Sequence, residues 1–513
     1  MRTRTLLFML PLLALACVRQ QPQPVKEPTP EPVVVDTVHE EPVVAAFPDT
    51  IYASAEKLMI MIDTVDVSLP STLSTLEDVY ADKPGIFIFR GASSRNPCFH
   101  GHLTDDSIQI KVDWEYTTRC DYTNTCLGSW GGGTGWTGQP LYVQWPDSLH
   151  QQEIIVVSLS GDVYFIDFQT GKSSREPLDV KNVLKGTPAL NASMNGHLYI
   201  GHAVPKGAPF GTQVVDVLSR QTVDITGRDN KAWRSWGGYD SSPIEAGGFL
   251  FRPAENGGIY KYYVGDGNYA LQSVLRYSTT HAKNSPGMES SMAICRNYGY
   301  VGDNAGNILC INLNTMKPVW HYWNHDDTDA SPVVEMEDGV PYVYTGCEVD
   351  RQGSNGYSYF VKLNGLTGDL VWEDTIRCHK LQYGDKSSDG GMYVTPILGE
   401  GDCEGLIFSS FCVQTSKTYS AFMAFDKRDG SVAYRVKMNH ECWSSPVAFY
   451  NDRHEMFIFI GDRAGSVFLI KGKTGEIVAS AKIGSNFESS PIIIDNKIIV
   501  GSRGNKIFRI SLQ

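Results

Sequence analysis

Residues 444–491 read SSPVAFYNDRHEMFIFIGDRAGSVFLIKGKTGEIVASAKIGSNFESSP, and they contain one complete unit of an internal repeat. The unit opens with small hydroxyl residues and Pro446, continues in an apolar segment, and turns at Gly465 into a segment of alternating character. A second turn at Thr474-Gly475 precedes the last segment, after which the opening motif returns at Ser489-Ser490-Pro491. Glycine permits the positive φ of tight turns, and a period of two indicates strands. The unit is therefore predicted to be a four-stranded antiparallel sheet.

The opening motif occurs eight times, at separations of 40 to 64 residues. Its copies are Gly138-Gln139-Pro140, Gly186-Thr187-Pro188, Ser241-Ser242-Pro243, Ser290-Ser291-Met292, Ala330-Ser331-Pro332, Val394-Thr395-Pro396, Ser444-Ser445-Pro446 and Ser489-Ser490-Pro491. Propeller blades of four strands have periods of about 40–50 residues, so the longer separations must hold loops. A sheet with two apolar faces buries both only when blades stack around an axis. We predict an all-β fold, one eight-bladed β-propeller of four-stranded antiparallel blades.

The last repeat stops after its third strand, at residues 506–512, because the chain ends at Gln513. Residues 108–117, IQIKVDWEYT, precede the first full repeat and have the aromatic character of a fourth strand through Trp114. We predict that this N-terminal strand completes the last blade, which removes the open edges of the ring. The alternative is seven complete blades beside an open partial sheet.

The repeats resemble the PQQ-like (pyrroloquinoline-quinone-like) repeat of quinoprotein-type β-propellers. The shared features, over residues 85–513, are the SSP-type opening, the G-x-[VI]-[YF]-x-[IL]-[DN] third strand, the T-G turn and a following Trp. Phe89-Arg90-Gly91, Arg95-Asn96 and His100-Gly101 also resemble the segment that enters such propellers. The resemblance implies the fold, but that fold hosts both quinoprotein dehydrogenases and non-catalytic scaffolds. Among the scaffolds, the propeller lipoprotein of the outer-membrane β-barrel assembly machinery is closest in character.

The first 16 residues have the pattern of a secretory signal peptide. Arg2 and Arg4 precede an apolar run over residues 6–15, which is too short to span a bilayer. Ala16 followed by Cys17 resembles a bacterial lipobox, and this resemblance implies cleavage before Cys17 and lipid attachment to it. The alternative is ordinary cleavage after Ala16 with an incidental cysteine.

The sequence divides into four parts. Residues 18–46 are rich in Pro, Glu and Val without hydrophobic periodicity, which is typical of an extended tether. The predicted parts are the signal peptide 1–16, the lipidated Cys17 with its tether 17–46, a lead-in segment 47–84 packed on the propeller, and the propeller 85–513. This order predicts an envelope protein anchored by lipid, in the outer membrane, that faces the periplasm or the surface.

The net charge and the cysteine content limit which partners and which covalent bonds the protein is expected to have. The formal net charge of −13 argues against a nucleic-acid surface, which needs clustered Lys and Arg. Besides Cys17 there are ten cysteines, and export permits disulfides. Cys120 with Cys126, and Cys403 with Cys412, are close enough in sequence to close small loops. The alternative for all of them is buried free thiols.

Superposition of the eight repeats brings one set of residues to a mouth of the central channel. These residues lie two positions before each Ser/Thr/Gln-Pro pair or its Ser-Met equivalent, and they are Thr137, Lys185, Asp240, Glu289, Asp329, Tyr393, Trp443 and Glu488. The four carboxylates, Asp240, Glu289, Asp329 and Glu488, are predicted to converge, and oxygen ligands in that arrangement suit Ca²⁺ or another hard cation. The alternative is a solvated acidic rim whose carboxylates cap strands or bond the backbone.

No catalytic residue is predicted. Quinoprotein alcohol dehydrogenases have two adjacent cysteines, and no Cys-Cys dipeptide occurs here. Their docking pattern A-x-D-x-x-T-G-x-x-x-W is eroded at residues 363–372, LNGLTGDLVW. We therefore expect no cofactor, leave Ca²⁺ open and do not favour PQQ.

The favoured function is a membrane-anchored, non-enzymatic propeller lipoprotein, a monomer that acts as a scaffold for envelope proteins in outer-membrane protein assembly. One alternative is a carbohydrate- or metal-binding surface lipoprotein that uses the acidic rim or the aromatic loops. The Gly-rich run 128–138, with Trp130 and Trp136, is such a loop. The other alternative is a periplasmic PQQ-dependent oxidoreductase.

Overall fold

The computed structural model of the chain describes residues 44–104, 108–146, 152–207, 209–280, 286–383, 386–413 and 419–513. Residues Val44–Gln513 form one unit. The predicted signal peptide, the lipidation site Cys17 and the tether up to residue 43 lie outside the described residues. Within the described ranges, no helix is long and apolar enough to cross a membrane.

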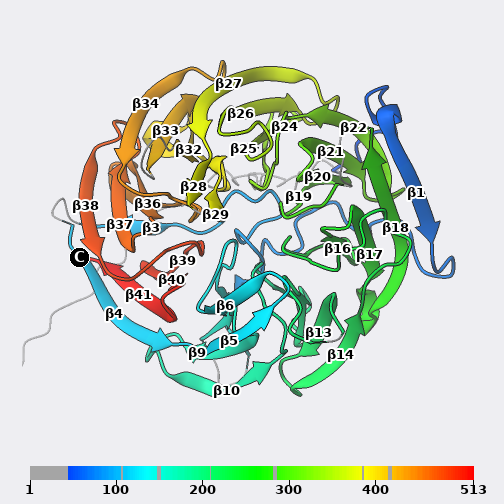
Figure 1. The fold of residues 1–513 in the computed structure, drawn as a ribbon, viewed down its shortest axis with the longest axis horizontal. Helices are drawn as coiled ribbons and strands as arrows, with labels where there is room; N and C mark the ends of the chain where they lie inside the picture. The colour runs from blue at the N-terminus through cyan, green and yellow to red at the C-terminus, as the bar shows by residue number, and fades with distance from the viewer. Residues whose placement is uncertain are drawn as a thin grey trace, which may run out of the picture. The chain divides into compact units, whose positions relative to one another are not determined.

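Eight of the ten described sheets are arranged around a central axis as blades of four antiparallel strands, as predicted, and the other two sheets have two strands each (Figure 1). From the inner to the outer strand, blades one to four are β7 (Leu141–Val143), β8 (Glu153–Val157), β9 (Asp162–Asp167) and β10 (Ser173–Asp179); β11 (Ala189–Leu190), β12 (His197–Gly201), β13 (Thr212–Asp216) and β14 (Gln221–Thr226); β15 (Ile244–Ala246), β16 (Phe249–Pro253), β17 (Gly258–Tyr263) and β18 (Ala270–Thr279); β19 (Ala293–Cys295), β20 (Tyr298–Gly302), β21 (Asn307–Asn312) and β22 (Lys317–Trp323).

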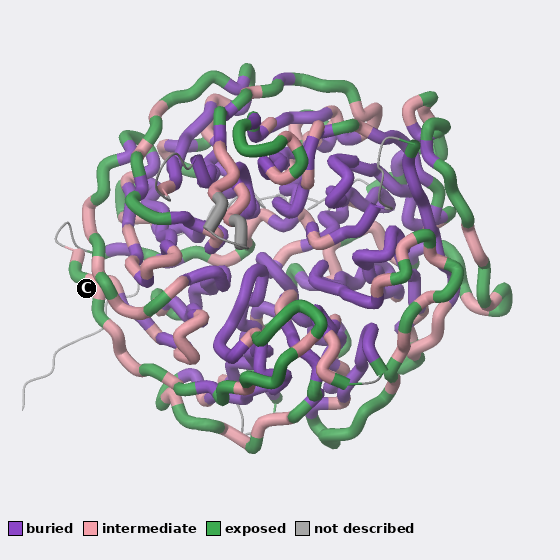
Figure 2. Tube along the Cα trace, viewed as in Figure 1, coloured by how far each residue is buried: buried purple, intermediate pink, exposed green. Residues whose placement is uncertain are grey.

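Blades five to eight follow the same order. They are β23 (Val333–Glu337), β24 (Val340–Gly346), β26 (Asn355–Asn364) and β27 (Leu370–His379); β31 (Ile397–Leu398), β32 (Leu406–Cys412), β33 (Ser420–Asp426) and β34 (Val432–Met438); β35 (Val447–Asn451), β36 (Met456–Gly461), β37 (Ser466–Lys471) and β38 (Ile477–Lys482); β39 (Ile492–Ile494), β40 (Lys497–Ser502), β41 (Lys506–Leu512) and β4 (Ile110–Thr117). Figure 2 shows that the inner strands are buried and that exposed residues gather on the outermost strands, although β18 and β22 are largely buried.

The N-terminal strand completes the last blade, as predicted. Strand β4 pairs antiparallel with β41, with Ile110 opposite Leu512 and Thr117 opposite Lys506. The ring is thus closed by hydrogen bonds between the two ends of the propeller sequence, and the alternative of an open partial sheet is wrong.

At four of the eight blade junctions, an aromatic side chain on the outer strand of one blade packs against the turn glycine of the next. A Cβ at Gly368 would lie 2.7 Å from Trp320, whose Nε1 donates to the Gly365 carbonyl at 2.8 Å. A contact of the same kind joins the last blade to the first, where a Cβ at Gly171 would lie 2.5 Å from Trp114. Trp372 with Gly430 and Tyr434 with Gly475 repeat the contact. Glycine is needed at this turn for two reasons: its φ is positive, and a side chain there would collide with the aromatic ring.

The lead-in segment contacts two blades from outside. Strand β1 (Leu58–Thr64), preceded by the 3-10 turn η1 (Ala55–Lys57), adds a fifth, outermost strand to blade three by pairing with β18. The Tyr52 amide donates to the Val319 carbonyl of blade four at 2.8 Å. Figure 1 shows β1 at the periphery of the ring.

The segment that follows crosses the channel and joins several blades. Strand β2 (Gly85–Ile86) pairs with β7 and β3 (Gly101–Leu103) with β35. Between them, Arg90 and Arg95 are fully buried. The guanidinium of Arg95 donates to the carbonyls of Met292 at 2.8 Å and Ser242 at 3.3 Å, which belong to neighbouring blades. The segment thus ties the innermost strands together from one side of the ring.

The two disulfides that the sequence permits are not formed, and the ten described cysteines are free thiols. Cys120 opens β5 (Cys120–Thr125), which pairs with β6 (Gly128–Gly132), and Cys126 follows the end of β5. Cys412 ends β32 and Cys403 ends the turn η3 (Gly401–Cys403) before it. Residues joined by an extended strand lie roughly 3.3 Å apart per position, so each pair is far beyond the reach of a disulfide. The sequence separations suggested loops, but the intervening residues are strands.

Replacement of Trp114 by alanine should weaken the contact that closes the propeller. The variant loses the packing on Gly171 and the hydrogen bond from Nε1 to the Phe168 carbonyl at 3.1 Å. We expect the free energy of unfolding in urea to fall by about 2–3 kcal/mol. Tyr122→Ala, at a side chain that is 73% exposed, is the control and should cost less than about 0.5 kcal/mol. Equal losses in both variants would contradict this role of β4.

Candidate functional site

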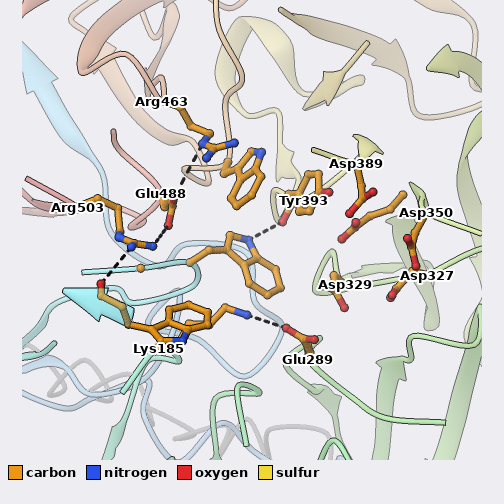
Figure 3. Close-up of a pocket in the computed structure, with 15 residues that line it drawn as sticks. Lys185, Glu289, Asp327, Asp329, Asp350, Asp389, Tyr393, Arg463, Glu488 and Arg503 are labelled. Carbon is orange, nitrogen blue, oxygen red and sulfur yellow. Dashed lines mark hydrogen bonds and ion pairs between the residues drawn. The ribbon is translucent and has the colours of Figure 1, made fainter. Parts of the chain in front are cut away.

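The mouth of the channel holds a cavity of about 410 Å³, and its walls are charged and aromatic (Figure 3). Its described lining is Trp130, Gly135, Trp136, Lys185, Glu289, Asp327, Asp329, Glu348, Asp350, Asp389, Tyr393, Trp443, Arg463, Glu488 and Arg503. Six of the eight positions that the repeat placed at the mouth line it, including three of the four carboxylates singled out there. The fourth, Asp240, lines an adjoining cavity that shares Lys185 and Glu289 with the first.

Lys185 pairs with two of the predicted carboxylates. Its ammonium lies 2.5 Å from Asp240 Oδ2 and 2.7 Å from Glu289 Oε2. Burial disfavours the charge on Lys185, but the two carboxylates outweigh it and raise the pKa of Lys185 above its usual value. Burial likewise opposes the ionisation of Glu289, yet Lys185 lowers its pKa overall. Asp240 and Glu289 therefore already have a cation of the protein between them.

Glu488 is also paired within the protein. Its carboxylate lies 3.3 Å from Arg503 Nη1 and 3.7 Å from Arg463 Nε. Arg463 further holds Glu441, with Nη1 2.5 Å from Oε2. Figure 3 shows Arg463 and Arg503 on either side of Glu488, so this wall of the cavity is balanced in charge.

Aromatic rings line the cavity between the charged walls. Tyr393 and Trp443 stack with ring centroids 4.6 Å apart, and Trp136 meets Tyr393 edge-on at 6.5 Å. The Trp136 Nε1 donates to the Tyr393 carbonyl at 3.0 Å, which joins blades one and six across the mouth. The Lys185 ammonium lies 5.1 Å from the centre of the Trp136 ring. These contacts fix the rings as rigid walls.

The remaining wall consists of carboxylates contributed by a connection and two insertions. Asp327 and Asp329 lie between β22 and β23, and Glu348 opens the short strand β25 (Glu348–Val349). Strand β25 pairs with β30 (Gly390–Gly391), which follows Asp389 and the hairpin of β28 (Leu381–Tyr383) and β29 (Lys386–Ser388). Figure 3 shows Asp327, Asp329, Asp350 and Asp389 on the same side of the cavity.

Buried Asp326 positions the loop that carries Asp350. Its carboxylate accepts the backbone amides of Asp350 and Arg351, both at 3.0 Å. Main-chain hydrogen bonds therefore hold this part of the acidic wall in position.

The acidic wall is electrostatically unbalanced. Burial, followed by the charges of neighbouring acids, raises the pKa of Asp329 to about 8 and the pKa values of Asp327 and Glu348 well above their usual range. One oxygen on each of these three carboxylates is buried without a hydrogen-bond partner. Lys380 pairs instead with Asp350 and, at 2.7 Å, with Asp389.

The repeat predicted one ring of mouth residues and missed a second. Arg463, Arg503 and Glu255 each follow the second strand of their blade by one or two residues, and they line the two cavities of the mouth. Their positions were visible in the motifs Arg463-Ala464-Gly465 and Arg503-Gly504. Glu348, Asp350 and Asp389 lie in insertions, for which the repeat offers no signal. Within the described residues, no group of three or more His, Cys, Asp or Glu side chains is placed to hold a metal ion.

The architecture defines the chain as an eight-bladed β-propeller with a charged, aromatic channel mouth. Comparison with protein-family profiles finds no match. In sequence, the chain is 21% identical over 97 residues to the human beta-alanine-activating enzyme, a match that covers 18% of this chain and only 9% of that protein.

Solved structures share the fold at low sequence identity. The quinohemoprotein alcohol dehydrogenase ADHIIG from Pseudomonas putida HK5 has a TM-score of 0.60 and 13% identity, over 86% of this chain and 82% of that one. BamB from Moraxella catarrhalis has a TM-score of 0.50 and 13% identity, over 79% of this chain and 98% of that one. At such identities the likeness concerns the fold alone, which is that of an eight-bladed β-propeller.

The charge of the lining is a poor match for PQQ, which is a tricarboxylic acid. The described lining contains seven carboxylates (Glu289, Asp327, Asp329, Glu348, Asp350, Asp389 and Glu488) and three cationic groups (Lys185, Arg463 and Arg503). The three cations already contact carboxylates of the protein. A polyanion in this cavity would face the unpartnered oxygens of the acidic wall, which is unfavourable at short range.

The free energy of unfolding should fall as the pH rises from the pKa of Asp329 in the unfolded chain to its higher pKa in the folded protein. The pKa of Asp329 is raised to about 8 in the folded protein, against about 3.9 in an unfolded chain. Between these values the unfolded protein gives up a proton that the folded protein retains, so ionisation favours unfolding. Asp329→Asn should therefore raise the melting temperature at pH 8 by at least about 2 °C and leave it nearly unchanged at pH 4. A rise of equal size at both pH values would show that burial of the charge is not the cause.

Proposed function

We propose that this protein is a non-enzymatic scaffold of the bacterial envelope, anchored through lipid on Cys17, that binds partner proteins by strand addition at β1. The observation that carries the proposal is the exposed, apolar and unpaired edge of β1. The lipobox and the tether support an envelope location. The shared fold with BamB is compatible with it.

Strand β1 is apolar on both faces. Met59, Ile60 and Met61 are 46%, 48% and 37% exposed, although successive side chains of a strand point to opposite faces. In the described chain, β1 is the last strand of its sheet and pairs only with β18. Its other edge offers free backbone donors and acceptors next to apolar side chains, which is the arrangement used for strand addition.

The outer strands of the other blades are built differently. Each carries charged residues, which discourage pairing with another chain. Among them are Arg175 in β10, Asp224 in β14, Lys317 in β22, Glu373 in β27, Arg435 in β34, Lys482 in β38 and Lys111 in β4. Strand β1 has one charged residue, Asp63, which is paired with Arg276 and Lys231, and its first five residues, LMIMI, carry none. The occupant is accordingly an extended, apolar strand of a partner protein, and flexible methionines suit such a contact.

A lysine at the centre of β1 should abolish partner binding. Ile60→Lys places a charge on the edge without altering a buried contact, so the melting temperature should change by less than about 2 °C. Crosslinking in native envelopes should then lose the products seen with the wild type. Ile477→Lys, at a residue 41% exposed on the outer strand β38, is the matched control and should retain them. Loss in both variants, or in neither, would contradict a docking role for β1.

The scaffold proposal and the quinoprotein alternative predict opposite results when PQQ is added, and we expect the result of the scaffold proposal. Addition of PQQ and Ca²⁺ to the purified protein should produce no dye-linked alcohol oxidation and no shift in quinone absorbance, because the mouth presents an excess of carboxylates to an anionic quinone. Alcohol-dependent dye reduction that requires PQQ would establish the oxidoreductase and overturn the scaffold proposal.

A further inference from the structure

We propose that the cavity at the channel mouth binds an organic cation, whose ammonium or guanidinium group is held by Asp327, Asp329 and Glu348. This site involves none of the residues of β1, so it goes beyond the scaffold function and stands independently of it. The three residues are the part of the mouth that the pairs of Lys185, Arg463 and Arg503 leave unbalanced.

The first argument is the state of the carboxylate oxygens. Asp329 Oδ1, Glu348 Oε1 and Asp327 Oδ1 are buried without a hydrogen-bond partner, and all three residues line the cavity. Asp329 is 8% exposed and Glu348 is 4% exposed. A buried acceptor without a donor is costly, and that cost is recovered when a ligand supplies N–H donors.

The second argument concerns the cations that the protein already has. The three cationic groups that line the cavity, and Lys380 beside it, contact other carboxylates. Lys185 lies between Asp240 and Glu289, and Lys380 lies between Asp350 and Asp389. None of these cations contacts Asp329 or Glu348, and burial together with neighbouring acids raises the pKa values of both. A cationic ligand would supply the N–H donors that their buried oxygens lack.

The third argument selects an organic cation over a bare metal ion. Across the described part of the chain, no three acidic, histidine or cysteine side chains converge as a metal ion requires. Ammonium and guanidinium groups have several divergent donors, which can reach carboxylates that are spread apart. The cavity of about 410 Å³ has the size of a small-molecule site.

The aromatic walls support the same class of ligand. Tyr393 and Trp443 line the cavity beside the acidic wall, and their stacked rings present apolar surface to the carbon skeleton of a ligand. Aromatic faces also attract organic cations. The same chemistry is offered by a free amine and by the lysine or arginine side chain of a peptide.

The test is isothermal titration calorimetry of the full mature chain at pH 8 with three probes. Putrescine represents a free amine, N-acetyl-lysine methylamide represents a peptide side chain, and Ca²⁺ represents a metal ion. We expect at least one of the two amines to bind with a Kd below about 1 mM and more tightly than Ca²⁺. The amine that binds better identifies the source of the cation.

Two variants and a matched control locate the site. Asp329→Asn and Glu348→Gln keep the shape of the side chain and should each weaken amine binding about tenfold. Glu245→Gln removes another buried carboxylate, with a pKa raised by burial to about 7, that lies outside the cavity. It should change the Kd by less than about twofold. The three substitutions replace a buried carboxyl by a neutral amide of the same shape. We therefore expect all three variants to fold, and thermal melts should check this.

Three outcomes would overturn the proposal. One is no binding of either amine, and the second is tighter binding of Ca²⁺ than of the amines, which would indicate a metal site. The third is equal weakening in Glu245→Gln and in the two cavity variants, which would show that the effect does not arise at the mouth.

Discussion

The closure of the propeller depends on a contact that recurs at four of the eight blade junctions, the packing of an outer-strand aromatic ring against the turn glycine of the next blade. Trp320 on Gly368 and Trp114 on Gly171 each combine ring stacking with a hydrogen bond from the indole to a turn carbonyl. A blade alone cannot bury its two apolar faces, and this contact sets how the next blade covers them. Because Trp114 comes from the N-terminal strand, the same contact also closes the ring.

Most of the fold could be predicted because the sequence pattern of a four-stranded blade occurs eight times in the chain. Even the closing strand was identified, since a repeat that lacks its fourth strand leaves an edge that only the aromatic segment around Trp114 could fill. Features that occur once were less accessible. Strand β1 has no counterpart in the repeat, and the cysteine pairs were misjudged because short sequence separation suggested loops where the chain is extended.

The mouth of the channel was predictable in position but not in chemistry. The repeat register brought Glu289, Asp329 and Glu488 to one cavity, as superposition implied. Which carboxylates are neutralised depends on how far side chains of other blades reach, and the register does not encode that. Lys185 reaches Asp240 and Glu289, whereas Asp329 lies beside insertions that add further acids.

The two proposed sites are both local exceptions to common rules of protein stability. Strand β1 presents a run of five apolar residues, LMIMI, at an edge of its sheet. At the channel mouth, Asp329 and Glu348 keep buried oxygens without a hydrogen-bond partner, whereas buried Glu153 is paired with Arg175. Each exception costs stability, and neither is needed to close the ring, which the aromatic contacts and β4 already achieve. Local exceptions of this kind in an otherwise consistent sequence are expected where a protein binds something, and the chemistry of each exception defines its ligand. An apolar strand edge selects another strand, and a buried, unbalanced acidic wall selects a cation.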